Sequence, residues 1–499
     1  MGKSLFKLCF VITCMSILIP VAAQQNFQNN QQPDFSRVNA LIHEQLINNK
    51  IPSISIAVIY KGKIILEKAY GMADKEKAIK ATINTPYYLA SLTKSITATA
   101  VLKLSEKKLI NLDTSANSYL KNSKLSSHLW NPGQATIKTL LHHTSGLTTY
   151  HRDYSMDNAG NLPPLNKDIN NYGIIFWKPG DHFDYSNIGY GVLGQIVADV
   201  SGKSFAYYLK DQVFSPLGMK DSFLGIDLKN KNIAIRYHSD SLRSRSANVV
   251  SYTMGASSAY SSVHDLTKYA MLLLNDKIEG TEKILSDSVI NKMETDTVTT
   301  GDLSEFYGYG LGVNTDYFGF IGVLGQGGTD DGQAWMQLIP SEDIGVILLA
   351  NTGIDGDACQ TIINESIATI LPGFRKKMSL TKKNNEAAET VKALPDSIYG
   401  SWVGKIHTAS GDINMHLTVD KNGSNYFQLA TLPRVKIAKL DYSSRRFFFD
   451  VSGNLHVADA GSGQYTLSFE LDRKGNKLYG ALTANASVQL PFWVELNKQ

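Results

Sequence analysis

Cysteine is scarce in this sequence of 499 residues, with Cys9, Cys14 and Cys359 as its only representatives. The first two lie in an N-terminal segment that we expect to be removed, which leaves the mature chain with one thiol. A single cysteine forms no internal disulfide and cannot build a cysteine-rich zinc site. In the apolar stretch "GIDGDACQTIINESIATIL" we expect Cys359 to be a small buried hydrophobic residue, with a cysteine nucleophile as the alternative.

The sequence also lacks an excess of one charge. Its 49 Lys and Arg against 45 Asp and Glu give a net charge of +4. The lysines are scattered and form no basic stripe with interleaved aromatic residues, so we expect no nucleic-acid partner. With 43% apolar residues the chain can bury a large core, and its length predicts two or three domains.

Long hydrophobic runs are absent except for one near the N-terminus, from Leu8 to Val21. Two lysines precede this run, and Val-Ala-Ala follows as a small-residue cleavage site before Gln24. Residues 1–23 therefore read as a signal peptide, which predicts an exported protein, periplasmic or secreted, without stable membrane insertion after cleavage. An uncleaved membrane anchor is one alternative, and lipid attachment at Cys14 is a weaker one.

The first two thirds of the mature chain predict one α/β unit. A polar stretch (24–36) precedes a helix expected over 37–49 and a hairpin made of "ISIAVIY" and "KIILEKAYG". Helices and long loops follow over 110–290. Strand patterns then return in "GVLGQGG", "GQAWMQLIP" and "IGVILLAN", before a helix at 357–371. Strands at both ends with helices between them indicate a sheet completed by distant segments.

The C-terminal part has a different pattern. We expect residues 374–395, which are charged and polar, to be a linker containing a short helix. From 396 to 499, short β runs alternate with turn signals every 8 to 12 residues, which predicts a small all-β barrel or sandwich. Gly400-x-Trp402 resembles the start of lipocalin-like barrels. We expect this domain either to narrow access to a catalytic cleft or to act as a stabilising module.

The stretch "YYLASLTKSITATAVLKL" contains a candidate nucleophile. Ser91 and Lys94 are three residues apart at the start of an apolar helix, so the lysine can lie beside the serine and act as its base. Ser-x-x-Lys occurs five times in the chain, so this spacing alone leaves open that Ser91 is an N-cap and Lys94 a surface residue.

Two further motifs lie downstream. Tyr185-Ser186-Asn187 is the only Tyr-x-Asn in the chain and precedes a predicted helix. A phenol there can shuttle a proton, and an asparagine amide can hold a substrate. A loop tyrosine beside a turn asparagine is the alternative. Gly325 to Gly328 contain three glycines that allow close backbone approach to a ligand, although a glycine-rich turn between strands explains them equally.

Together and in this order, these motifs resemble the serine β-lactamase and penicillin-binding-protein superfamily, in the branch with class C β-lactamases, D,D-carboxypeptidases, D-aminopeptidases and esterases. The resemblance covers roughly residues 37–370, and supporting segments include "LLHHTSGL", "WKPG" and "FSPLGMKDS". It implies a β-lactamase-like α/β (α+β) fold, an antiparallel sheet flanked by helices plus a helical subdomain. It also implies a hydrolase domain over 24–373.

The resemblance also assigns roles. It makes Ser91 the acylated nucleophile, Lys94 its general base, Tyr185 the end of the proton shuttle and Asn187 a substrate-positioning residue. The glycine-rich strand Gln326-Gly327-Gly328 would flank the substrate. The backbone N–H groups of Ser91 and Thr329 would form the oxyanion hole. No metal or organic cofactor is implied, and His142 and His143 are expected to be structural.

One position departs from the family pattern. The third motif of the family begins with lysine or histidine, where this chain has Gln326. A neutral amide holds a carboxylate less firmly and leaves the Tyr185 phenol harder to ionise. We therefore expect a serine hydrolase, of esterase or peptidase type, acting on a small-molecule ester, amide or D-amino-acid peptide. A β-lactamase or D,D-carboxypeptidase is one alternative, and a catalytically inactive ligand-binding relative is another.

Overall fold

Two hydrophobic strands that are almost 300 residues apart in the sequence pair in the middle of one antiparallel sheet. In this computed structural model, β1 pairs with β14 so that Ile54 lies opposite Ala350 and Tyr60 opposite Ile344. The structure describes residues 33–155, 164–225, 232–240, 242–247, 249–278, 280–381, 394–430, 432–443 and 446–499. The predicted signal peptide lies outside these residues.

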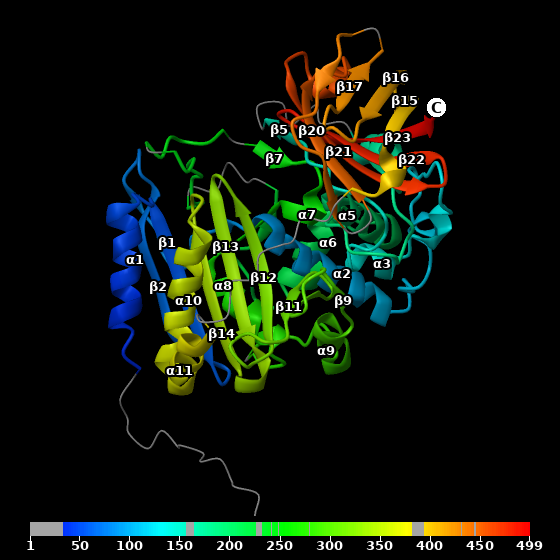
Figure 1. Cartoon of the computed structure of the whole chain (residues 1–499). Coiled ribbons are helices and arrows are strands. Elements are labelled where there is room, and N and C mark those ends of the chain that lie inside the picture. The colour runs from blue at the N-terminus through cyan, green and yellow to red at the C-terminus, as the bar shows by residue number, and fades with distance from the viewer. Residues whose placement is uncertain are drawn as a thin grey trace, which may run out of the picture. The chain divides into compact units, whose positions relative to one another are not determined.

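The central sheet has nine strands in the order β3-β2-β1-β14-β13-β12-β11-β10-β9 (Figure 1). Their bounds are β1 Ser53–Tyr60, β2 Lys63–Asp74, β3 Ile79–Lys80, β9 Val298–Thr299, β10 Glu305–Tyr307, β11 Gly312–Asn314, β12 Gly322–Thr329, β13 Gly332–Ile339 and β14 Ile344–Ala350. The predicted hairpin is present. Its turn residues Lys61 and Gly62 have φ values of 51° and 67°, the left-handed conformation that a two-residue hairpin turn requires.

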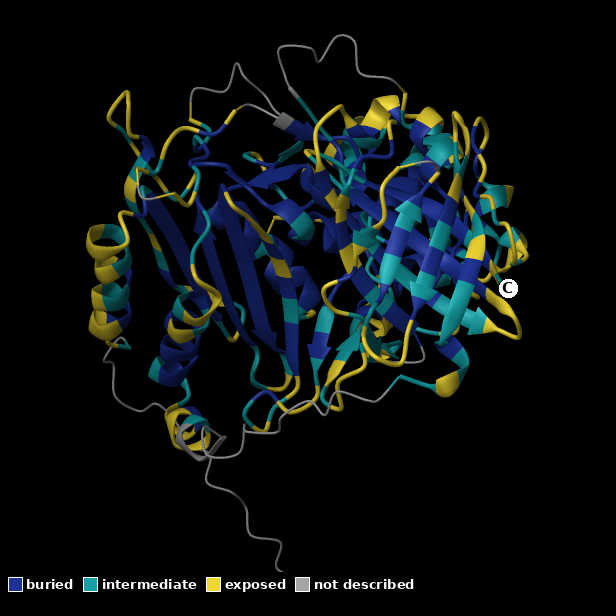
Figure 2. Ribbon diagram, turned by 45° about the horizontal axis from the view of Figure 1, so that its top comes forward, coloured by how far each residue is buried: buried dark blue, intermediate teal, exposed yellow. Residues whose placement is uncertain are grey.

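Helices cover both faces of this sheet. On one face, Ile54, Ile56 and Val58 of β1 pack in a core with Val38 of α1 and Ile363 of α10. On the other face, Ala57 and Ile59 join a core that includes residues of α2 and α8. Figure 2 shows the middle strands as buried, whereas α1 is exposed on its outer side. The period-two alternation of β1 thus places its side chains in two separate cores.

The helices expected over 37–49 and 357–371 are present as α1 and α10, each beginning and ending one residue earlier than expected, and nine further α-helices lie in the described residues. Their bounds are α1 Ser36–Asn48, α2 Thr93–Glu106, α3 Ile137–Leu141, α4 Leu165–Tyr172, α5 Asn187–Ser201, α6 Phe205–Leu209, α7 Met254–Ser257, α8 Val263–Leu273, α9 Asp287–Thr295, α10 Gly356–Ile370 and α11 Pro372–Thr381. Short strands form two further small sheets, β4 Tyr87–Tyr88 with β8 Ala259–Ser261 and β6 Phe223–Leu224, and β5 Asp153–Ser155 with β7 Val249–Ser251.

The beginning of the predicted linker is helical. Helix α11 contains Phe374, which is fully buried, and its ring contacts Tyr317 and Phe318 near the central sheet. This segment therefore packs against the connection between β11 and β12. Residues 382–393 of the predicted linker lie outside the described residues.

The C-terminal part is an all-β sheet, as the sequence predicts. Nine antiparallel strands follow the order β18-β17-β16-β15-β23-β22-β21-β20-β19 and curl into a half-barrel (Figure 1). Their bounds are β15 Gly400–Thr408, β16 Gly411–Val419, β17 Tyr426–Leu429, β18 Val435–Lys436, β19 Asp441–Ser443, β20 Arg446–Gly453, β21 Tyr465–Lys474, β22 Lys477–Asn485 and β23 Gln489–Lys498. Trp402 is fully buried, and its indole N–H donates to the Ile398 carbonyl at 2.7 Å.

The C-terminal sheet is attached to the rest of the compact unit Phe35–Gln499 by specific contacts. His151 and Gln489 exchange two backbone hydrogen bonds, of 3.0 and 2.7 Å. The carboxylate of Asp459 accepts a hydrogen bond from the Tyr172 hydroxyl at 2.5 Å and pairs with Arg152 at 3.3 Å. These contacts fix the C-terminal part against helix α4 and the loop that follows the "LLHHTSGL" segment.

Candidate active site

Ser91 lies on a short 3₁₀ turn, Ala90–Leu92, that leads into helix α2. The preceding Ala90 has a φ of 44°, a left-handed conformation that is unfavourable for a residue with a Cβ. Such backbone strain is typical of functional sites, where the surrounding structure holds it in place. The turn leaves Ser91 partly exposed while the residues on either side of it are buried.

Lys94 is the base candidate, and it is almost completely buried, with 1% of its surface exposed. Its Nζ lies 3.0 Å from Ser91 Oγ, 2.8 Å from Asn187 Oδ1 and 3.1 Å from the Ala256 carbonyl oxygen. Burial lowers the pKa of this amine well below its ordinary value. A neutral amine donates its two hydrogens to Asn187 and Ala256 and directs its lone pair at the Ser91 hydroxyl.

Tyr185 completes the arrangement on the other side of the serine. Its hydroxyl donates to Ser91 Oγ at 2.8 Å, and Lys94 Nζ lies 4.5 Å from the centre of its ring. Burial raises the pKa of Tyr185 to about 12, although the hydrogen bond with Ser91 acts in the opposite direction. The phenol is therefore protonated near neutral pH and is a proton donor in the resting site.

The Tyr-x-Asn motif is positioned by the start of helix α5. Ser186 caps this helix by accepting a hydrogen bond from the Gly189 N–H at 3.1 Å, and its own hydroxyl donates to the Thr148 carbonyl at 3.0 Å. Tyr185 therefore precedes the cap and Asn187 opens the helix, so that both side chains reach Ser91 and Lys94.

His143 fixes the same motif, which agrees with the structural role expected for it and specifies what it holds. The backbone N–H of Asp184 donates to the His143 carbonyl at 2.7 Å, and the N–H of Ser186 donates to His143 Nδ1 at 3.0 Å. The imidazole lies against the Tyr185 ring, with 4.4 Å between the ring centres. Burial lowers the pKa of His143 well below its ordinary value, so the ring is neutral and Nδ1 can accept. His143 thus holds the backbone on both sides of Tyr185.

Strand β12 approaches the nucleophile through its backbone at Gly327. A Cβ at this position would lie 2.1 Å from the Leu89 carbonyl oxygen and 2.5 Å from the Ser91 nitrogen, which no side chain could occupy. Glycine at 327 is therefore a steric requirement for packing the strand against the 3₁₀ turn. Gln326, one residue earlier, is exposed and forms no hydrogen bond with Ser91, Lys94 or Tyr185.

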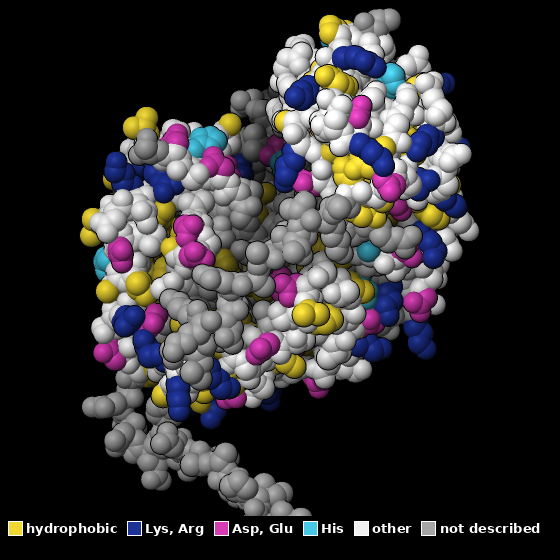
Figure 3. Space-filling model, in the orientation of Figure 1, with side chains coloured by type: hydrophobic (Ala, Val, Ile, Leu, Met, Phe, Trp, Pro, Cys, Tyr) yellow, Lys and Arg dark blue, Asp and Glu magenta, His cyan; other side chains and the backbone are white. Residues whose placement is uncertain are grey.

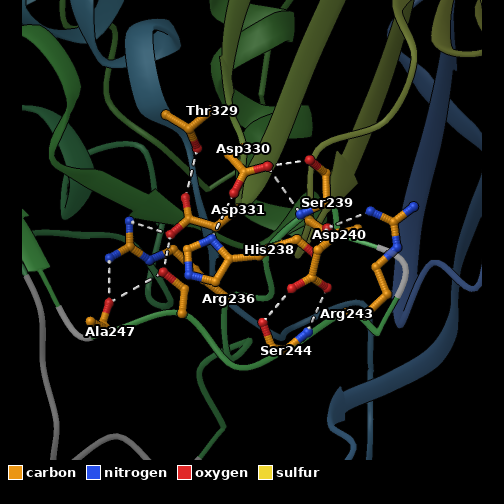
Figure 4. A network of polar contacts seen from close by, with 12 residues as sticks. Arg236, His238, Ser239, Asp240, Arg243, Ser244, Ala247, Thr329, Asp330 and Asp331 are labelled. Carbon is orange, nitrogen blue, oxygen red and sulfur yellow. Dashed lines mark hydrogen bonds and ion pairs between the residues drawn. The ribbon is translucent and has the colours of Figure 1, made fainter. Parts of the chain in front are cut away.

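The end of β12 is held by a network of polar contacts (Figure 4). The Thr329 hydroxyl donates to Asp331 at 2.8 Å, and Asp331 pairs with the largely buried Arg236 at 3.5 Å. The neighbouring carboxylate, that of Asp330, accepts a hydrogen bond from the His238 ring at 2.6 Å. The segment that contains Arg236 and His238 therefore fixes the turn beside Thr329, the residue expected to contribute an oxyanion-hole N–H.

A cavity of about 770 Å³ adjoins this site. Thr148, Asp184 and Tyr185 line it from the side of the nucleophile, whereas Phe448 and Glu470 line it from the C-terminal sheet. Because the Tyr185 hydroxyl bonds Ser91, the cavity reaches the immediate neighbour of the nucleophile. A substrate bound there would contact both parts of the chain.

The described residues include no group of three or more His, Cys, Asp or Glu side chains that could hold a metal ion. They also include no helix long and apolar enough to cross a membrane. On the face seen in Figure 3, positive and negative side chains are interspersed, so this face has no extensive patch of one charge.

The predicted site residues thus fall into two groups. The structure brings together the side chains of Ser91, Lys94, Tyr185 and Asn187 within hydrogen-bonding distance. The glycine-rich strand contributes backbone rather than side chains, through Gly327 and the fixed position of Thr329. Cys359 is fully buried in α10, as expected, and lies in the core on the α1 face of the sheet.

Comparison with known proteins gives matches over the same region. The family model described as Beta-lactamase matches residues 38–366. Protein flp of Staphylococcus aureus strain MW2 is 28% identical over 330 residues, which cover 63% of this chain and 62% of that protein. The chain therefore spans less than two thirds of the length of this relative.

Solved structures match the fold. The octameric penicillin-binding protein homologue from Pyrococcus abyssi has a TM-score of 0.57 and 24% identity, and the match covers 92% of this chain and all of that one. A class C beta-lactamase has a TM-score of 0.57 and 20% identity, with 67% of this chain and 95% of that chain covered. The first of these similarities extends over most of the chain, and the second over two thirds of it.

Proposed function

Since the chain belongs to the Beta-lactamase family, whose members include serine hydrolases, we propose that it hydrolyses an ester or amide through an acyl-enzyme on Ser91. One observation carries this proposal. A buried lysine amine and a protonated phenol converge on the same serine oxygen, at 3.0 and 2.8 Å. This is the arrangement that an activated nucleophile requires.

The acylation step follows from the positions of these groups. The lone pair of Lys94 accepts the proton of the Ser91 hydroxyl while Oγ attacks the substrate carbonyl carbon and forms a tetrahedral intermediate. When the intermediate collapses, the bond to the leaving oxygen or nitrogen breaks, and Tyr185 gives its phenolic proton to the departing atom. The proton taken up by Lys94 then restores the phenol. Water attacks the acyl-serine in the second half of the reaction, with the proton transfers reversed.

The negative charge on the intermediate requires donors beside Ser91. We assign this role to the backbone N–H groups of Ser91 and Thr329. The contact of Gly327 with the Ser91 nitrogen and the polar network at Thr329 support this assignment. Backbone donors that are fixed before the reaction need no reorganisation when the charge develops.

The substrate in this proposal need not carry a carboxylate. Gln326 is neutral and exposed, so it supplies no charge for a carboxylate and none that would favour an ionised Tyr185. An esterase or amide hydrolase, including one for D-amino-acid peptides, is therefore favoured over a β-lactamase or a D,D-carboxypeptidase.

The test is hydrolysis of p-nitrophenyl acetate by the purified chain beside its Ser91→Ala variant. We expect activity in the wild type and its loss in the variant, whereas equal activity in both would place the chemistry elsewhere. Nitrocefin turnover at a rate comparable to the ester would instead favour a β-lactamase. A chain that no acylating probe modifies at Ser91 would be a ligand-binding relative.

We also propose that the protein is exported after removal of residues 1–23. The sequence of that segment supports this, with its basic start, apolar run and small-residue cleavage site. The mass of the protein recovered from the periplasm or medium of an expressing bacterium tests it. A species that begins at Gln24 is expected, and retention of the full-length chain in the membrane fraction would contradict the proposal.

A further inference from the structure

The outer face of the C-terminal sheet borders the cavity beside Tyr185. In strand β20, Phe447 and Phe449 are buried in the interior of the half-barrel, whereas Phe448 points the other way and is half-buried. Phe448 and Asp450 lie on the same face of the strand and both line the cavity. An aromatic ring and a carboxylate from the C-terminal sheet thus line the same cavity as Tyr185, whose hydroxyl bonds Ser91.

This wall is tied to the catalytic side by aromatic and charged contacts. The Arg446 guanidinium lies 4.0 Å from the centre of the Trp177 ring, and it also pairs with Glu470 of the adjacent strand. The Trp177 indole N–H in turn donates to Asp184 at 2.8 Å, directly before Tyr185. The sheet is therefore held at a fixed position relative to the nucleophile.

The charges that line the cavity do not balance. Glu470 is paired with Arg446, and Asp441 is paired with Lys439 at 2.8 Å. Asp450 is exposed and has no ion-pair partner among the described residues. Asp184 accepts a hydrogen bond from the uncharged indole of Trp177. Burial and, to a smaller extent, the nearby charge of Glu470 raise the pKa of Asp184 to about 7. Asp450 is therefore the unpaired charge among the described residues that line the cavity, and a cation would complement it whereas an anion would not.

We propose that the outer face of the C-terminal sheet is the distal wall of the substrate pocket, where Phe448 contacts an apolar group of the substrate and Asp450 selects for an amine over a carboxylate. The proposal deepens the function proposed above and rests on it for the site. It predicts that the substrate class is an ester or amide with an apolar group and an ammonium group. The C-terminal sheet then determines specificity and does not take part in bond breaking.

Three probes that share a phenyl ring on a three-carbon chain and end in a positive, neutral or negative polar group test this wall: 3-phenylpropylammonium, 3-phenylpropanol and 3-phenylpropionate. Their binding to the Ser91→Ala variant of the whole chain is measured by calorimetry, which needs no hydrolysis. We expect the ammonium to bind about fivefold more tightly than the alcohol, as an exposed charge pair allows, and the carboxylate to bind most weakly.

Variants of the wall separate its two elements. In the Ser91→Ala background, Asp450→Asn should abolish the advantage of the ammonium over the alcohol. Phe448→Ala should weaken all three probes by a similar factor, about fivefold for a partly covered ring, and Phe448→Leu by less. Tyr426→Ala is the matched control, because Tyr426 is a half-buried aromatic residue on β17, several strands away in the sheet. It should leave all three affinities unchanged.

The outcomes distinguish this proposal from the proposed function. Equal binding of the three probes would contradict the proposal that Phe448 and Asp450 form the distal wall of the pocket. Affinities that Phe448→Ala and Asp450→Asn leave unchanged would contradict it as well. Serine-dependent hydrolysis of p-nitrophenyl acetate would still stand in that case. Charge-ordered binding by a chain whose wild type hydrolyses nothing would support the wall and reject the hydrolase.

Discussion

Replacing Gly327 by alanine should separate strand β12 from the nucleophile. The added Cβ would lie 2.1 Å from the Leu89 carbonyl oxygen and 2.5 Å from the Ser91 nitrogen. Carbon and oxygen atoms approach to about 3.3 Å, so the strand or the turn must shift by about 1 Å. Both obstacles are backbone atoms at the start of the 3₁₀ turn, which cannot rotate away as a side chain could.

A displacement of about 1 Å at a catalytic group can reduce the rate by about 100-fold, which corresponds to about 2.7 kcal/mol in the barrier. Overpacking of this kind also destabilises a fold by about 1–3 kcal/mol. We therefore expect Gly327→Ala to lower kcat/KM for p-nitrophenyl acetate by about two orders of magnitude and to lower the melting temperature by a few degrees.

Gly325→Ala is the matched control on the same strand. The nearest atom to its new Cβ is Met336 Cε at 3.0 Å, the mobile end of a flexible side chain that can move aside. This variant should keep most of the activity. If Gly327→Ala retained activity within threefold of Gly325→Ala, β12 would not be in contact with the turn and the oxyanion-hole assignment would fail.

Three further predictions concern Asn187, Lys94 and Cys359. Asn187→Asp places a carboxylate next to the Lys94 amine, which should favour the ammonium form and raise the pKa of Lys94. The acid limb of the kcat/KM profile should therefore shift to higher pH. Asn187→Ala, which adds no charge, should lower activity without that shift. Lys94→Met should abolish activity and stabilise the fold by about 1–3 kcal/mol near neutral pH, because the unfolded chain holds a proton that the buried amine releases. This gain, measured by urea unfolding, should shrink as the pH approaches 10, and a pH-independent gain would contradict the reasoning. Burial raises the pKa of the Cys359 thiol to about 12, so iodoacetamide at pH 8 should modify it only after denaturation; rapid modification of the native chain would show that α10 is not packed as described.

Local chemistry explains the elements that the sequence predicted well. Lys61-Gly62 and the alternation of β1 determine a hairpin, and Ser186 is a strong N-cap for α5. The Ser91–Lys94 spacing also defines a geometry within one helical turn. Such signals depend on neighbours within a few residues, so they can be read without the tertiary fold.

Features that depend on tertiary contacts were not predictable. The third partner of Lys94 is the backbone carbonyl of Ala256, an atom that every residue carries and that no sequence pattern marks. The role of His143 depends on the backbone on both sides of Tyr185. The glycine-rich motif suggested a ligand loop or a turn, and only the proximity of the 3₁₀ turn identifies why Gly327 lacks a side chain.

The pairing of β1 with β14 has a consequence for how the protein acquires activity. Ile54 cannot meet Ala350 until nearly 300 intervening residues have been made and brought into place. Closing so long a loop is entropically costly, and contacts of such sequence separation slow folding. The strand that approaches Ser91 belongs to the same sheet, so a nascent or truncated chain ending before β14 should lack acyl-transfer activity. If the proposed function holds, recovery of p-nitrophenyl acetate hydrolysis during refolding should report the closure of the central sheet.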